Sequence, residues 1–140
     1  MKSNCENLNH ALIEFYEKLS SWEATIVKGK GLSLTLIHAV EILGAFGAMP
    51  MKDLAKKVGV TTGTLTVQVD NLEKAELVER VPHHQDRRSI LVKLTDKGSA
   101  LFQEHDHLHL QLTEKLTADF SEDEIQRLSE LMSRLNGAFK

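Results

Sequence analysis

The chain has 140 residues, of which 41% are hydrophobic, 26% are charged and 5% are aromatic, and its formal charge is −3. This composition fits one ordinary soluble domain that is large enough to bury a core without disulfide cross-links. The single cysteine, Cys5, argues against a secreted disulfide scaffold. The opening residues include Asn and Glu where a secretory leader needs an apolar run, and no later stretch is apolar enough to span a bilayer. We therefore expect a cytoplasmic protein without a membrane partner.

The charge is distributed unevenly along the chain. Residues 1–50 carry a net charge of −1, residues 51–95 carry +2 and residues 96–140 carry −4. The middle third is the only candidate face for a polyanion. Because +2 over that length also fits an ordinary solvated surface, the residue pattern has to decide between the two interpretations.

Two helices are predicted in the first third. Apolar residues recur at three- and four-residue steps over residues 8–26, which predicts a helix that ends near Gly29. Ser33 is placed to cap a second helix, which should continue to Gly44. Residues 47–50, which begin with Gly and end with Pro, predict a connector.

The middle third begins with two further helices. A short helix over residues 51–58 is expected to end at Gly59, and Thr61 should begin the next one. Three apolar residues of that next helix are spaced for burial, namely Leu65, Val69 and Leu72. The residues that face away from the core are Thr62, Gly63, Thr66 and Val67, whereas Thr64 should be partly buried.

A hairpin and two long helices complete the prediction. The period changes to two over residues 77–81 and 90–94, which predicts two strands joined by a polar loop. Thr95 or Asp96 is placed to cap a long helix, and Ser121 forms a capping box with Glu124 at the start of the last helix. The fold is therefore expected to be mainly α, with five or six helices and one hairpin.

This order of elements is that of a winged helix-turn-helix, in which the second helix enters the DNA major groove. Short side chains in the first turn of that helix let its N–H groups approach phosphates, and Thr61 can serve as cap, as phosphate contact or as both. Hydroxyl and amide groups one turn further on can meet base edges. Arginines at the hairpin tip suit the minor groove, with a solvated turn as the alternative, and Asp86 is expected to orient Arg88 through a bidentate pair. The predicted DNA-contacting residues are Thr61, Thr62, Gly63, Thr64, Thr66, Val67, Gln68, Asp86, Arg87 and Arg88.

Five segments carry a family resemblance: DLAKKVGVT (53–61), TLT (64–66), DNLEK (70–74), DRR (86–88) and VKLTDKG (92–98). Together they make the chain resemble the MarR family of transcriptional regulators. The resemblance implies an N-terminal dimerisation helix (1–32), a DNA-binding lobe (33–95) and C-terminal dimerisation helices (96–140). It also implies repression that a ligand relieves. Many relatives carry Arg or Lys where this chain has Val67, which can contact a thymine methyl group instead.

A homodimer is also expected on physical grounds. Two recognition helices related by a two-fold axis, one turn of DNA apart, read a palindrome in double-stranded DNA. The apolar stripes of the first helix and of the last two helices exceed what the short central helices can cover. Surplus apolar surface of this kind predicts a partner.

The histidines suggest an effector site. His105 and His109 are four residues apart on one helix face, a spacing at which two imidazoles can share a metal ion, and His38 is expected to pack near that face. The chain also resembles the zinc-responsive branch of the family, which implies Glu23 as a further ligand. It also resembles the branch that regulates fatty-acid synthesis, and a histidine network or an acyl-chain pocket is favoured over the metal site. We expect no required cofactor, with zinc, an acyl chain or another small molecule as the effector.

Other functions find less support in the sequence. It holds no P-loop, no dinucleotide-binding glycine motif and no nucleophile elbow, so we expect no enzyme. The alternatives are a helical dimer that binds proteins without touching DNA and a hydrolytic metal centre at the histidines. Cys5 is interpreted as a surface thiol rather than as a peroxide sensor.

Overall fold

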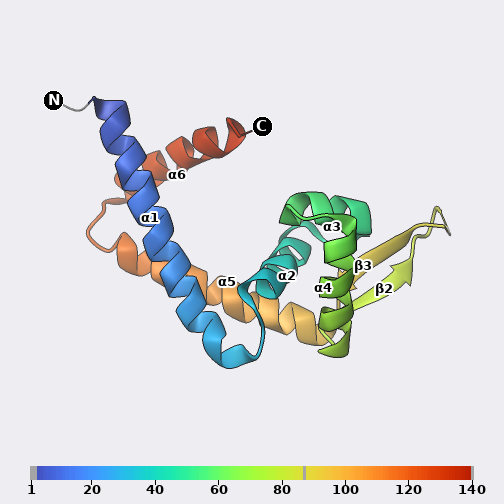
Figure 1. The fold of residues 1–140 in the computed structure, drawn as a ribbon. Coiled ribbons are helices and arrows are strands. Elements are labelled where there is room, and N and C mark those ends of the chain that lie inside the picture. The colour runs from blue at the N-terminus through green and yellow to red at the C-terminus, as the bar shows by residue number, and fades with distance from the viewer. Residues whose placement is uncertain (1–2, 87, 140) are drawn as a thin grey trace. The chain divides into compact units, whose positions relative to one another are not determined.

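A computed structural model describes residues 3–86 and 88–139 of the chain. The chain divides into two compact units, Met1–Phe102 and Gln103–Lys140. The elements, shown in Figure 1, are α1 (Asn4–Val27), the short 3₁₀ turn η1 (Lys28–Lys30), α2 (Leu34–Phe46), β1 (Met49–Pro50), α3 (Met51–Val58), α4 (Thr62–Lys74), β2 (Val78–Pro82), β3 (Ile90–Leu94), α5 (Asp96–Leu116) and α6 (Glu122–Gly137). The predicted mainly helical winged helix-turn-helix is confirmed. None of the helices in the described part of the chain combines the length and the apolar character needed to cross a bilayer.

The helix starts follow the predicted caps. The Ser33 hydroxyl accepts a hydrogen bond from the Leu36 N–H at 3.2 Å, and Ser121 forms a reciprocal capping box with Glu124. Both caps satisfy N–H groups that have no partner inside their helix. Thr95 rather than Asp96 caps α5, because its hydroxyl oxygen accepts from the Gly98 N–H at 3.0 Å.

Helix α2 runs past its predicted end at Gly44 and stops at Gly47, whose φ of +84° favours glycine. At Gly44 the backbone of α2 packs directly against the Phe102 ring, because a Cβ atom at this position would lie 2.2 Å from that ring. Glycine read as a helix breaker therefore placed the end of α2 two residues before its last residue, Phe46.

The small sheet has one strand more than predicted. Its order is β1-β3-β2 and all pairs are antiparallel, with Met49 opposite Val92 and Pro50 opposite Leu91. The predicted connector over residues 47–50 is thus wrong for its last two residues. A two-residue edge strand tolerates proline, which donates no hydrogen bond to a ladder, and it has no periodicity that a sequence could reveal.

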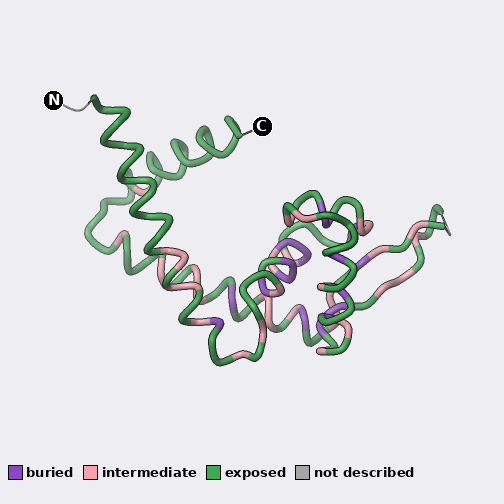
Figure 2. Tube along the Cα trace, in the orientation of Figure 1, coloured by how far each residue is buried: buried purple, intermediate pink, exposed green. Residues whose placement is uncertain are grey.

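The core of the first unit fixes the helix-turn-helix. Figure 2 shows the buried positions gathered in α2, α3, α4 and the sheet. Leu54 of α3, Leu65, Val69 and Leu72 of α4, and Val92 of β3 are all fully buried. Each such aliphatic side chain contributes roughly 1.5–3 kcal/mol when it leaves water. The orientation of α4 is therefore set by the three inward residues that its spacing predicted.

Candidate nucleic-acid interface

The turn between α3 and α4 is short and closely bonded. Gly59 ends α3 with a φ of +84°, a conformation that glycine adopts without strain. The N–H groups of Gly59 and Val60 both donate to the Ala55 carbonyl, at 2.9 and 3.0 Å. The chain reverses within three residues, so α3 and α4 form the predicted helix-turn-helix.

Threonines dominate the first turn of α4. The Thr61 hydroxyl oxygen accepts from the Thr64 N–H at 3.1 Å, and its proton is donated to the Thr64 hydroxyl oxygen at 3.1 Å. Thr61 is therefore the helix cap that the sequence predicted. Thr62, Gly63 and Thr64 are all exposed. The expected partial burial of Thr64 is wrong, because its side chain turns back to Thr61 and away from the core.

The outward side of α4 continues with Thr66, Val67 and Gln68. The Thr66 hydroxyl donates to the Thr62 carbonyl at 2.8 Å. Val67 is 60% exposed. Gln68 is only half-buried as a residue, but its Oε1 atom is buried and has no hydrogen-bond partner among residues 3–86 and 88–139. A base contact from Gln68 would accordingly come from its amide nitrogen.

The hairpin tip is held by a compact set of turn bonds. The His83 N–H donates to the Ser89 carbonyl and the Ser89 N–H donates to the Asp86 carbonyl, each at 3.0 Å. The Asp86 carboxylate accepts from the Arg88 backbone N–H at 3.0 Å. This corrects the expected pairing of Asp86 with the Arg88 guanidinium, since a carboxylate two residues before an N–H satisfies it locally at little entropic cost. Arg88 is exposed at the tip, and Arg87 lies outside the described residues.

An ion-pair cluster that was not predicted from the sequence joins the hairpin to α4. Arg80 of β2 contacts Asp70, with a nitrogen–oxygen distance of 2.9 Å, and also contacts Glu73. The two carboxylates are three residues apart and so lie on one side of α4. That spacing was visible in the sequence, but nothing local indicated that the cation would come from a strand.

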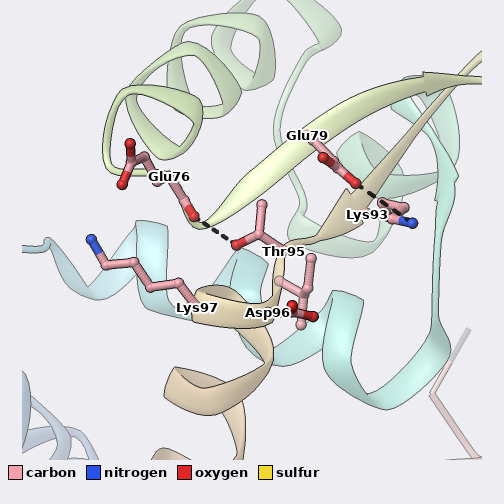
Figure 3. A pocket seen from close by; sticks show the side chains of 7 residues that line it. Glu76, Glu79, Lys93, Thr95, Asp96 and Lys97 are labelled. Atoms are coloured by element: carbon pink, nitrogen blue, oxygen red, sulfur yellow. Dashed lines mark hydrogen bonds and ion pairs between the residues drawn. The ribbon is translucent and has the colours of Figure 1, made fainter.

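A polar cleft of about 540 Å³ marks the base of the hairpin (Figure 3). There the Thr95 hydroxyl donates to the Glu76 carbonyl at 2.6 Å, and the Lys97 ammonium donates to the Ala75 carbonyl at 3.0 Å. A Cβ atom on Gly98 would lie 2.0 Å from the Leu77 carbonyl oxygen. The VKLTDKG segment therefore fastens the end of α4 to the start of α5.

Comparison with known proteins identifies the family. The model of the MarR family matches residues 32–90, which include the helix-turn-helix and the hairpin tip. The uncharacterised HTH-type transcriptional regulator YfiV of Bacillus subtilis is 30% identical over 112 residues, which make up 78% of this chain and 68% of YfiV. The chain belongs to the MarR family.

Two further comparisons agree with this assignment. The chain is 29% identical to the HTH-type transcriptional regulator MhqR of Bacillus subtilis over 105 residues. These residues make up 75% of this chain and 72% of MhqR. The crystal structure of Streptococcus pneumoniae FabT in complex with DNA matches with a TM-score of 0.83 and 27% identity, covering 96% of each chain. The protein is a MarR-family transcriptional regulator, of a class whose members are generally not enzymes.

The first unit of this MarR-family chain holds a second cleft, with a volume of about 420 Å³. It lies between α1, α2 and the turn before α4. Its lining residues are Tyr16, Ser20, Glu23, Leu34, Thr35, His38, Glu41, Val58 and Val60. Its walls combine apolar and polar side chains, and its volume lies within the range of small-molecule sites.

The predicted metal ligands belong to two different units. His38 and Glu23 lie in the first unit and line the second cleft. His105 and His109 lie on the part of α5 that belongs to the second unit, with their ring centroids 4.8 Å apart. A metal site that combines these four residues stays a prediction.

Proposed function

We propose that the protein binds a palindromic operator in double-stranded DNA as a homodimer and represses transcription until an effector releases it. The observation that carries the proposal is the exposed threonine face of α4. The opposite face of this helix is fully buried and fixes its orientation, and the neighbouring hairpin exposes Arg88. The N-terminal turn of α4 supplies N–H groups and hydroxyls for phosphates, and the hairpin supplies a permanent cation. The likeness to FabT, whose solved complex contains DNA, supports the same assignment.

The dimer is supported by uncovered apolar faces. Leu128, Leu131 and Leu135 lie on one side of α6 and are about 40% exposed. Figure 2 shows most of that helix in the colour of exposed residues. Leu8, Leu12 and Phe15 form a similar exposed stripe on α1. Amphipathic helices with free apolar sides are stabilised by packing against another copy. The expected compartment is the reducing cytoplasm, on the strength of the single exposed cysteine, Cys5.

The effector is proposed to bind in the second cleft. Val58 and Val60 line this cleft and flank Gly59, two residues before the cap of α4. A ligand that displaced either valine would alter the turn that positions the recognition helix. We expect a small molecule or an acyl chain there, because the walls are partly apolar.

Zinc is retained as an alternative effector, because His105 and His109 place two imidazoles on one side of α5. Two nitrogen donors at this spacing fit two positions of a tetrahedral ion. Calorimetric titration with zinc chloride would show saturable binding that His105→Ala with His109→Ala abolishes. Unchanged heats in the double variant would remove zinc from the proposal.

The experiment that tests the function is selection of bound DNA from a random pool. The proposal predicts an enriched palindrome whose half-sites lie about 10 base pairs apart, one helical turn of DNA. Recovery of no common sequence would instead favour a helical dimer that binds only proteins. Repeating the selection with zinc or with a long-chain acyl thioester would identify the effector by loss of enrichment.

A further inference from the structure

We propose that α4 recognises thymine through its 5-methyl group and that Val67 is the residue that determines this specificity. The inference rests on the proposed function, since it requires that α4 enters the major groove. It names which base that helix reads and by which chemistry.

The outward side of α4 lacks the groups that read guanine. Between Thr61 and Glu73 the sequence contains neither Lys nor Arg. Specific contacts to guanine in the major groove depend mainly on long cationic donors that reach its O6 and N7 atoms. A helix without such donors has to read other features of the base pairs.

Val67 supplies an apolar surface at the centre of that side. The residue is 60% exposed, and it lies between the exposed threonines of the first turns and the paired carboxylate of Asp70. The thymine methyl group is the only apolar group that a base presents in the major groove. Contact between the valine methyls and this group removes both surfaces from water, which is favourable at any approach angle because the interaction is non-directional.

Thr66 adds a polar contact that is compatible with this preference. Its hydroxyl proton is donated to the Thr62 carbonyl at 2.8 Å, so the side chain offers a base an acceptor oxygen and a methyl group. The major-groove donors that such an acceptor can meet are the amino groups of adenine and cytosine. Adenine is the partner of thymine, so the Thr66 acceptor fits the A·T pair that Val67 selects, while the discrimination itself rests on Val67.

The test replaces each thymine of the selected operator by deoxyuridine, which lacks only the methyl group. Changing the contacted thymine of one half-site to deoxyuridine should lower the affinity of the wild-type dimer about fourfold, as expected for loss of one buried methyl group. The same change in both half-sites should lower it about fifteenfold. Val67→Ala should bind the thymine operator more weakly and lose its sensitivity to deoxyuridine. Val67→Thr, which keeps one methyl group, should retain part of that sensitivity.

Ile90→Ala is the matched control, since it truncates an aliphatic residue that is 49% exposed and lies in β3, outside the recognition helix. This variant should remain as sensitive to deoxyuridine as the wild type. Selective operator binding with no sensitive thymine, or equal sensitivity in Val67→Ala, would overturn the inference while leaving the proposed function intact. Failure to bind any duplex selectively would overturn both.

Discussion

Replacing Arg80 by methionine should weaken operator binding about tenfold without dissociating the dimer. Methionine keeps the unbranched stem of the side chain and removes its charge. In the structure the guanidinium joins β2 of the hairpin to Asp70 and Glu73 of α4. The substitution therefore removes one contact between the hairpin and the recognition helix and leaves two carboxylates without their cation on an element that approaches phosphates.

The magnitude follows from the exposure of the three groups. The Arg80 side chain is 25% exposed, and the carboxylates of Asp70 and Glu73 are 53% and 36% exposed. Ion pairs this accessible contribute about 0.5–1 kcal/mol each, so the free energy of unfolding should fall by about 1–2 kcal/mol. A carboxylate about 10 Å from a phosphate in water is repelled by about 0.4 kcal/mol, before salt screening. Loss of the guanidinium makes the cluster more negative by one charge, and one charge that faces about three or four phosphates reaches about 1.4 kcal/mol, which is about tenfold in affinity.

The assay is fluorescence anisotropy on the selected operator. A triple variant, Arg80→Met with Asp70→Asn and Glu73→Gln, removes the unpaired charges and should recover most of the lost affinity. Arg127→Met is the control, because it breaks an exposed ion pair with Glu130 inside α6, and it should bind DNA as the wild type does. Arg80→Met that binds as tightly as the Arg127→Met control would refute the reasoning.

Three further substitutions probe the junction, the cap and the dimer. Gly98→Ala should lower the free energy of unfolding by about 2–4 kcal/mol in a denaturant titration, because its Cβ meets the Leu77 carbonyl oxygen. The control Gly29→Ala, whose Cβ meets open space, should change the free energy of unfolding little. Equal effects of the two variants would contradict the close approach at Gly98. Thr61→Val should cost about 1 kcal/mol of stability through loss of the α4 cap and should weaken operator binding. Thr61→Ser keeps the hydroxyl and should restore both stability and binding. Unchanged stability and binding in Thr61→Val would show that the cap is dispensable. Leu131→Lys should shift sedimentation towards the monomer, because it places a charge on the exposed apolar side of α6, and a stable dimer in this variant would place the interface elsewhere.

Local signals were sufficient for most of the fold. The caps at Ser33, Thr61 and Ser121 and the apolar spacing within α4 depend on residues three or four positions apart, so they can be read from one sequence. The strand β1 and the Arg80 cluster could not be predicted in this way, because each is defined by a partner far along the chain.

The interface was predicted less completely than the fold. The sequence identified the exposed positions of α4 but not how their polar atoms are used. Gln68 turns its oxygen inward, Thr66 commits its proton to Thr62, and Asp86 bonds to the backbone of Arg88. These hydrogen bonds depend on which neighbouring N–H or carbonyl lacks another partner, and that is decided by the three-dimensional fold.

The central claim is that α4 and the hairpin tip together contact duplex DNA. The most direct test measures the affinity of the wild type and of Arg88→Ala for the selected operator across a range of salt concentrations. The account predicts that affinity falls steeply with salt and that Arg88→Ala lowers the log–log slope by about one for each protomer, because one phosphate-region cation is lost. Identical affinities and slopes for the two proteins at every salt concentration would contradict it.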